Sequence, residues 1–312
     1  MASPNPPFVT RTLPYGDAAL AEAAAEIARG GCVAVPTETV YGLAADATDS
    51  RAVAGIYAAK GRPSFNPLIV HVIDLAAARA MARFDAAAEA LAARWWPGPL
   101  TLVLPLADDS PVASLVTAGL PTVAIRVPAH RAMQALLEAT GRPLAAPSAN
   151  ASGGISPTRA AHVAASLDGR IALILDDGPT PAGIESTIVD VAQGLVLRPG
   201  PITADDLGLA THEGSGPITA PGQLASHYAP AKPLRLDATS ARPGEWMIGF
   251  GDVSGDDTLS PTGDLVEAAA RLFDALHRAD ASDRAAIAVA PVPQHGLGEA
   301  INDRLRRAAV RD

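Results

Sequence analysis

The segment KGRPSFNPLIVHV, residues 60–72, joins a predicted helix to a predicted buried strand and decides how the chain is organised around it. Two cations, two prolines and an amide stand directly before the apolar run LIVHV. Pro63 and Pro67 restrict the backbone while keeping it irregular, which suits a preorganised anion site. A helix that passes through a polar turn into a strand is typical of an α/β fold.

The segments on either side alternate between strand-like and helix-like patterns. Apolar β-rich runs predict strands, and apolar residues at helical spacing predict helices. The predicted strands are residues 31–36, 68–72, 100–106, 122–128, 144–147, 171–177, 186–191 and 195–200. The predicted helices are residues 49–60, 85–95, 130–139 and 158–167. The alternation is too irregular for a barrel of eight equal units, which indicates a mixed α/β domain.

The chain changes character after residue 201. Residues 208–233 are rich in Gly, Pro, Ser, Thr and His and lack apolar periodicity, which predicts a long linker. Residues 234–312 have a βαβα pattern, which predicts a small Rossmann-like domain. We therefore expect a first domain over residues 10–207, followed by the linker and this second domain.

Composition limits the classes of function. A chain of 312 residues with 48% hydrophobic and 18% charged residues is typical of a soluble globular protein, and no stretch approaches the roughly 18 apolar residues of a membrane helix. The N-terminal residues show no secretion signal, and a single cysteine excludes an internal disulfide framework, so we expect a cytoplasmic protein. The net charge of −9 argues against a broad basic face for nucleic acid.

Polar groups follow the predicted strands. PTETVYGLAADA, residues 36–47, offers hydroxyls at Thr37 and Thr39 and a carboxylate at Glu38, although its simplest interpretation is a strand-to-helix loop. Lys60 and Arg62 suit phosphate oxygens, and Asn66 adds an amide, although cations at a helix end are also favoured by the helix dipole.

Two polar residues lie inside apolar strands. His71 interrupts residues 68–72, where a lone histidine is more often a satisfied core residue than a ligand-binding one. Arg126 lies in residues 122–128, and if it is buried it needs an anionic partner. That partner is either a carboxylate ligand or an internal Asp.

Further loops carry hydroxyls and amides. APSANASGG, residues 146–154, supplies Ser148 and Asn150, which could hold an anion or a nucleobase edge. ESTIVD and LRPG, residues 185–190 and 197–200, predict a hairpin that turns near residues 193–194. The sequence has no Walker A motif, nucleophile elbow, kinase motif set or clear Ser-His-Asp arrangement, and no metal-ligand spacing, so no protein metal site is expected.

Five motifs, in their order along the chain, resemble those of the YrdC-like family over roughly residues 13–210. They are PTETVYGL, KGRP with Asn66 and LIVHV, the SAN of residues 148–150, ESTIVD and LRPG. The segment PGQLASHYAP, residues 221–230, and the βαβα tail are similar to the long two-domain members, which are threonylcarbamoyl-AMP synthases. The resemblance implies a twisted mixed sheet with flanking helices, plus the small Rossmann-like C-terminal domain. It also implies that the linker forms a lid over the active site.

The implied activity is that of a nucleotidyltransferase. It joins L-threonine, bicarbonate (or CO2) and ATP into L-threonylcarbamoyladenylate and releases pyrophosphate, as the first step of N6-threonylcarbamoyladenosine formation in tRNA. Mg2+ is expected to arrive with ATP rather than in a dedicated protein site. A downstream threonylcarbamoyl transferase complex is the implied partner, tRNA is involved indirectly, and no membrane is involved.

The resemblance also assigns residues, each by its place in a motif. Lys60 and Arg62 are the implied catalytic residues. The implied L-threonine site consists of Thr39, His71, Arg126, Ser148 and Ser186. The implied ATP site consists of Lys60, Arg62, Asn66, Thr122, Ser148, Asn150, Thr158, Arg198 and Tyr228. A carbamoyltransferase with a YrdC-like domain is disfavoured because a single cysteine cannot form its zinc fingers, and the alternative of another class is a non-catalytic RNA-binding YrdC-like module.

Overall fold

A computed structural model describes residues 9–63, 65–212 and 226–310. Its helices are α1 (Asp17–Ala28), α2 (Ser50–Lys60), α3 (Leu75–Arg79), α4 (Ala86–Trp95), α5 (Ser114–Thr117), α6 (Arg131–Thr140), α7 (Ala160–Leu167), α8 (Ala204–Leu207), α9 (Leu265–Ala281) and α10 (Leu297–Ala309). Within the described ranges, no helix has the length and apolar character needed to cross a membrane.

The strands form two sheets. The first runs in the order β1 (Arg11–Pro14), β8 (Leu173–Asp176), β2 (Val33–Pro36), β3 (Tyr41–Asp46), β7 (Leu144–Ala145), β4 (Ile69–His71), β6 (Thr122–Arg126), β5 (Leu100–Pro105), β9 (Thr187–Asp190), β10 (Leu195–Arg198) and β11 (Ala210–Thr211). The second runs β12 (Leu234–Arg235), β15 (Ala286–Val289), β13 (Glu245–Gly249) and β14 (Asp257–Thr258). Parallel and antiparallel pairs coexist in the first sheet, which confirms the expected mixed α/β fold.

The predicted helices are confirmed by their own end signals. Asp49 caps α2 by accepting a hydrogen bond from the Arg51 amide, and Gly61, with a φ of 60°, ends it. Asp85 and Asp264 cap α4 and α9 in the same way. The three aspartates fix where these helices begin, and Gly61 ends α2 within the KGRP turn.

One expectation from the sequence was wrong. Residues 36–47 are not a strand-to-helix loop, because Tyr41–Asp46 forms β3, which pairs antiparallel with β2 and is buried throughout. Buried on both faces, β3 has no polar alternation to mark it as a strand. Part of the predicted linker is also a strand, since β11 extends the first sheet beyond residue 207. Residues 213–225 of that linker lie outside the described residues.

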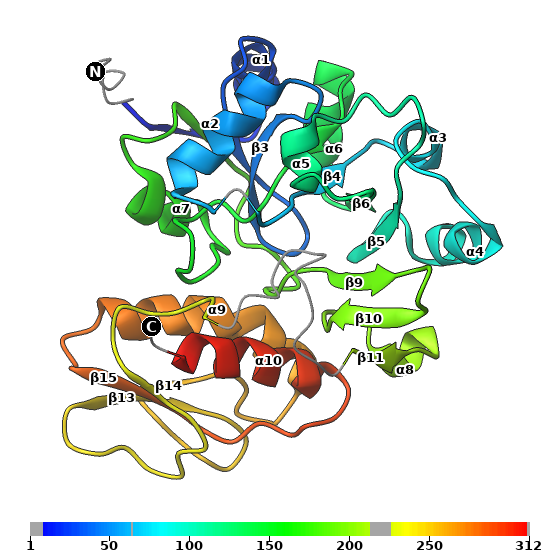
Figure 1. The fold of residues 1–312 in the computed structure, drawn as a ribbon. Helices are drawn as coiled ribbons and strands as arrows, with labels where there is room; N and C mark the ends of the chain where they lie inside the picture. The colour runs from blue at the N-terminus through cyan, green and yellow to red at the C-terminus, as the bar shows by residue number, and fades with distance from the viewer. Residues whose placement is uncertain (1–8, 64, 213–225, 311–312) are drawn as a thin grey trace.

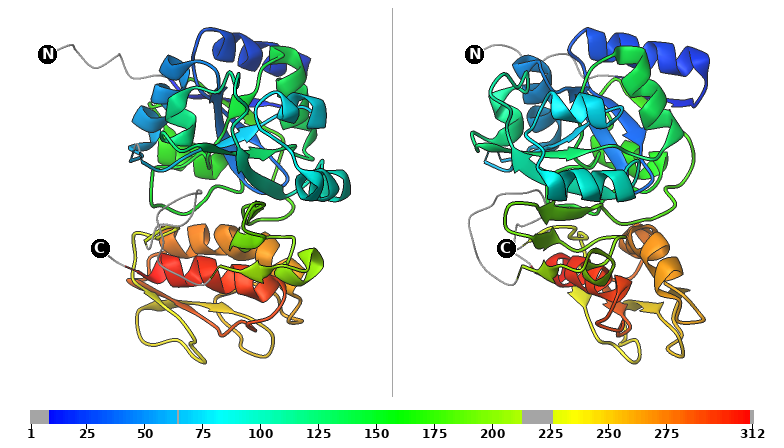
Figure 2. Two further views of the ribbon diagram at one scale, coloured as in Figure 1. Left: turned by 45° about the vertical axis from the view of Figure 1, so that its right-hand side comes forward. Right: turned by 90° about the vertical axis from the view of Figure 1, so that its right-hand side faces the viewer.

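The second unit has the expected Rossmann-like character, with an entirely parallel four-stranded sheet. Figures 1 and 2 show α9 and α10 between this sheet and the first unit, so the two helices form the layer that faces the larger domain. A buried apolar cluster runs across the junction, where Val40, Ile155 and Ile184 of the first unit join Leu272 and Phe273 of α9. The two units therefore share part of their core.

Candidate active site

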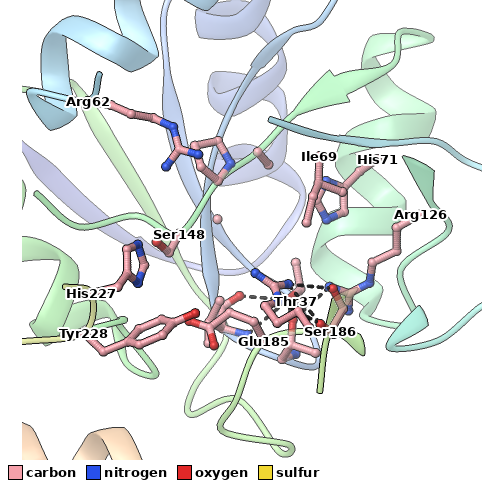
Figure 3. Close-up of a pocket in the computed structure, with 16 residues that line it drawn as sticks. Thr37, Arg62, Ile69, His71, Arg126, Ser148, Glu185, Ser186, His227 and Tyr228 are labelled. Carbon is pink, nitrogen blue, oxygen red and sulfur yellow. Dashed lines mark hydrogen bonds between the residues drawn. The ribbon is translucent and has the colours of Figure 1, made fainter. Parts of the chain in front are cut away.

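A pocket lies where several predicted motifs meet, at the carboxyl ends of the parallel strands β4 and β6. His71 ends β4, Arg126 ends β6, and the two residues are register partners. Figure 3 shows their side chains together on one side of the pocket, with His227 and Tyr228 together on the other. The lining residues are Thr37, Thr39, Val40, Gly42, Arg62, Ile69, His71, Arg126, Ala146, Pro147, Ser148, Glu185, Ser186, Arg198, His227 and Tyr228.

Arg126 is buried and its charge is paired within the protein. Its Nη2 lies 2.6 Å from Glu38 Oε1, its Nη1 donates to Thr39 Oγ1 at 2.9 Å, and its Nε donates to the Gly98 carbonyl at 3.1 Å. The internal carboxylate that was one of the two expected partners is therefore present, as Glu38 rather than an Asp. The pair keeps a buried cation compensated while its guanidinium still reaches the pocket.

His71 is neutral at ordinary pH. Burial lowers its pKa to about 3, and the charge of Arg126 acts in the same direction. Its Nδ1 has no hydrogen-bond partner among the described residues, and the ring lines the pocket. A buried polar atom without a partner is costly in a finished core, so this geometry favours a ligand-facing role over the core interpretation.

Arg198 and Ser186 form a second polar group at the base of the β9–β10 hairpin, which the structure confirms as an antiparallel pair. Arg198 Nε donates to the Ser186 carbonyl at 3.1 Å, and its Nη2 reaches Ser186 Oγ at 3.1 Å. Ser186 Oγ also contacts Thr101 Oγ1 at 2.8 Å. Both residues line the pocket, so the hairpin presents a cation and a hydroxyl there.

The KGRP turn, residues 60–63, is held in place by hydrogen bonds from its own basic side chains. Arg62 donates through Nε to the Asn66 carbonyl at 3.2 Å and through Nη2 to the Pro67 carbonyl at 2.8 Å. Lys60 Nζ donates to the carbonyls of Ser148 and Asn150, each at 2.5 Å. Lys60 thus ties the end of α2 to the loop that carries Ser148, a contact between motifs that lie far apart in the sequence.

Burial and mutual repulsion lower the pKa values of the basic side chains in this region. Burial lowers the pKa of Lys60 well below its usual value, with Arg62 adding to the effect. Burial also lowers the pKa of Arg62 to about 10. For His227 burial acts first, and Arg62, Lys60 and Arg198 lower its pKa further. The guanidinium groups that line the pocket are those of Arg62, Arg126 and Arg198. Three such groups in a buried pocket favour a ligand with several negative charges.

The structure separates the candidate residues into two groups. Those that line the pocket are Thr39, Arg62, His71, Arg126, Ser148, Ser186, Arg198 and Tyr228. Those that do not line it are Lys60, Asn66, Thr122, Asn150 and Thr158. Lys60 is bonded to the backbone of the loop that carries Ser148 and Asn150. Asn66 is buried, with no hydrogen-bond partner for its side-chain amide among the described residues. Thr122 begins β6, at the opposite end from Arg126.

Four residues at or beside the pocket were not assigned to the site from the sequence. Thr37, Glu185 and His227 line it, and Arg304, on α10, donates to Glu185 at 3.0 Å. The first three lie within the motifs PTETVYGL, ESTIVD and PGQLASHYAP, beside residues that were assigned to the site. Arg304 lies in a helix of the second unit and has no local signal.

Comparison with known proteins gives a consistent result. Residues 25–200 match the family model Sua5_yciO_yrdC, described as Telomere recombination, and residues 184–310 match Sua5_C, described as Threonylcarbamoyl-AMP synthase, C-terminal domain. The threonylcarbamoyl-AMP synthase of Bacillus subtilis is 42% identical over 96% of both chains. That of Pyrococcus abyssi is 41% identical over 92% of this chain and 93% of its own length.

A solved structure supports the fold over nearly the whole chain. The crystal structure of P. abyssi Sua5 complexed with L-threonine superposes with a TM-score of 0.87 and 36% sequence identity. The match covers 96% of this chain and 97% of that one. Both units and their relative placement are therefore shared with a two-domain protein that binds an amino acid.

Proposed function

This chain belongs to the family of two-domain threonylcarbamoyl-AMP synthases, and from that premise we propose how its pocket acts on its substrates. The chain is a nucleotidyltransferase that makes L-threonylcarbamoyladenylate from L-threonine, bicarbonate (or CO2) and ATP, with release of pyrophosphate. The observation that carries the assignment of roles is the convergence of Arg62, Arg126 and Arg198 on one pocket from three separate segments. The RNA-binding alternative has no comparable support.

The threonine end of the pocket is assigned to the side that holds Arg126. Its guanidinium presents a planar fork that matches the amino acid carboxylate, and Thr39 already holds one of its nitrogens in place. His71 is neutral, so it can bind the substrate amine or hydroxyl without repelling the ammonium group. Ser148 and Ser186 add hydroxyls along the same pocket.

The nucleotide end is assigned to Arg62 and Arg198, with His227 and Tyr228 beside them. The threonine amine bonds to the carbon of bicarbonate, which loses water, or to CO2, in which case the amine loses a proton. The resulting carbamate oxygen attacks the α-phosphorus of ATP while the bond to pyrophosphate breaks. No protein nucleophile is needed, so catalysis rests on orientation and on stabilisation of negative charge. Lys60 contributes by holding the Ser148 and Asn150 carbonyls in place.

Mg2+ is assigned to the substrate. No group of three or more His, Cys, Asp or Glu side chains that could hold a metal occurs among the described residues. The pocket carboxylate Glu185 and the nearby carboxylate of Glu38 are both engaged with arginines. We therefore propose that Mg2+ enters on the ATP phosphates, where it neutralises charge on the leaving pyrophosphate.

Tyr228 is assigned to a lid. It is buried against the pocket, and its hydroxyl has no hydrogen-bond partner among the described residues. Tyr228→Ala should raise the release of pyrophosphate without adenylate product, because water would reach bound ATP. Unchanged coupling between ATP consumption and product would reject the lid.

The product is a mixed anhydride, which hydrolyses readily in water. We propose that a threonylcarbamoyl transferase complex takes it up and transfers the group to tRNA, and that both steps occur in the cytoplasm, where ATP and tRNA are available.

Pyrophosphate release tests this function. The full chain should release pyrophosphate only when L-threonine, bicarbonate and MgATP are all present, and tRNA should have no effect on the rate. Tight binding of tRNA together with release that is independent of threonine would instead support the RNA-binding alternative.

A further inference from the structure

Arg304 of the second unit is fully buried, and its contacts lie largely on the first unit. It is the largest of the fully buried side chains among the described residues, and its Nε donates to Glu185 Oε2 at 3.0 Å. Its Nη1 donates to the Pro199 carbonyl at 2.7 Å and to Asp303 Oδ2 at 3.0 Å. Its guanidinium carbon lies 5.5 Å from the centre of the Tyr228 ring.

These contacts reach three separate segments that border the pocket. Glu185 directly precedes Ser186, and Pro199 directly follows Arg198, so Arg304 joins the two open ends of the β9–β10 hairpin. The third contact is the lid residue Tyr228. One side chain of the second unit thereby holds both ends of the hairpin and contacts the lid.

The Glu185 carboxylate is fully used in this arrangement. One oxygen accepts from Arg304, and the other accepts from Ser156 Oγ at 2.5 Å. A carboxylate fixed on both sides is poorly placed to move protons, but it anchors the backbone from which Ser186 projects. Burial alone would lower the pKa of Arg304, yet the adjacent Tyr228, Glu185 and Asp303 hold it above its usual value, so its charge is permanent.

We propose that Arg304 is a positioning residue of the active site, through which the C-terminal domain sets the geometry of Ser186, Arg198 and Tyr228. This inference rests on the proposed function, because it assumes that these three residues contact substrates. The second domain thereby contributes to catalysis through one buried side chain and does more than cover the site.

The test compares full-length variants by pyrophosphate release and by hydrogen exchange. Arg304→Met removes the fork, Arg304→Lys keeps the charge, and Asp274→Asn is the matched control. Asp274 pairs with Arg159 across the same domain junction at 2.8 Å, and neither residue lines the pocket.

We expect Arg304→Met to lower kcat/KM for threonine at least about tenfold, with partial recovery in Arg304→Lys, while Asp274→Asn stays within about twofold of wild type. A folded Arg304→Met variant with wild-type kcat/KM would overturn the proposal, as would an equal loss in Asp274→Asn. If Arg304→Met does not fold, Arg304→Lys decides, because one ammonium cannot reproduce the fork. Wild-type kcat/KM in that variant would then contradict the proposal.

Hydrogen exchange separates this inference from the proposed function. Amides at residues 185–187, 198 and 200 should exchange at least about tenfold faster in Arg304→Met, or in Arg304→Lys if only that variant folds, whether or not the chain makes an adenylate. Inactive wild-type protein would reject the function, whereas unchanged exchange at these amides would reject the role of Arg304.

Discussion

Arg126 shows how a buried cation can be held in place by the protein itself. Its charge is balanced by Glu38 at 2.6 Å and its orientation is fixed by Thr39 at 2.9 Å. A substrate carboxylate therefore meets a guanidinium that is already oriented, so little rotamer entropy is lost on binding.

Replacement of Arg126 tests this assignment. Hydrogen bonds to charged groups contribute about 1.5–3 kcal/mol each, so Arg126→Ala should raise the KM for threonine about 10- to 100-fold, with a smaller effect on the KM for ATP. Arg131→Ala is the control, because Arg131 is exposed and pairs with Asp177. Steady-state kinetics on folded protein that show an unchanged threonine dependence would refute the assignment.

His71 gives a prediction for stability against pH. Its pKa is 6.5 in the unfolded reference and about 3 in the folded protein. As pH falls below about 6.5, the unfolded state therefore gains a proton that the folded state does not, and stability is lost by up to about 1.4 kcal/mol per pH unit until about pH 3.

Urea unfolding at pH 7 and pH 5 measures this effect. Between those values wild type should lose about 1–2 kcal/mol more than His71→Gln, which cannot titrate. For each protein, the compared quantity is the difference between its free energies of unfolding at pH 7 and pH 5. A different stability of the variant at pH 7 therefore does not affect the comparison. Equal losses would show that the imidazole is not buried as a neutral group.

The limits of prediction are clearest for these side chains. Arg126 and His71 could be recognised as candidates because burying a polar side chain inside an apolar strand costs free energy unless it has a partner or a ligand. Glu38 was visible as a carboxylate, but its pairing with Arg126 could not be inferred, because the two residues belong to segments far apart in the sequence and only the fold brings them together. Side-chain partners across such distances follow from tertiary structure rather than from local pattern.

Among the secondary-structure elements, the ends of helices and strands bring the motifs into contact. The KGRP turn was predicted from its prolines and cations, yet its main connection is Lys60 to the Ser148 and Asn150 carbonyls. β3 was missed because it is buried along its whole length and shows no alternation. The turn that leads into this strand holds Thr37 and Thr39 with their hydroxyls 2.8 Å apart.

Lys60→Ala tests the connection between α2 and the Ser148 loop. Loss of the two short hydrogen bonds from Lys60 Nζ should slow adenylate formation about 10- to 100-fold in single-turnover experiments, with less effect on threonine binding. Lys232→Ala is the matched control, because Lys232 also donates to backbone carbonyls, those of Ala279 and Ser282, but in the second unit. Equal rates in the two variants would refute a catalytic contribution of Lys60.

Across the complete chain, the two units are joined by more than a linker. They share an apolar cluster, and Gly183 approaches α9 so closely that a Cβ would lie 2.4 Å from the Ala270 carbonyl oxygen. The βαβα pattern of the second unit was predictable from periodicity. Its docking was not, because the contacts, such as Arg304 with Glu185, join residues far apart in sequence.

A shared core predicts cooperative unfolding. Differential scanning calorimetry of the full chain should show a single transition whose calorimetric and van't Hoff enthalpies agree, and ATP with threonine should raise its midpoint. Two separated transitions, with only the first shifted by ligands, would mean that the units unfold independently and that the junction contributes little stability.

The central claim is that one pocket joins threonine, a one-carbon unit and the AMP moiety of ATP. The most direct measurement is mass spectrometry of the products formed by the full chain from L-threonine, [13C]bicarbonate and MgATP. The predicted result is threonylcarbamoyl-AMP that carries the 13C label, together with pyrophosphate, and loss of this product when threonine is omitted. Pyrophosphate and AMP without any labelled conjugate would contradict the claim.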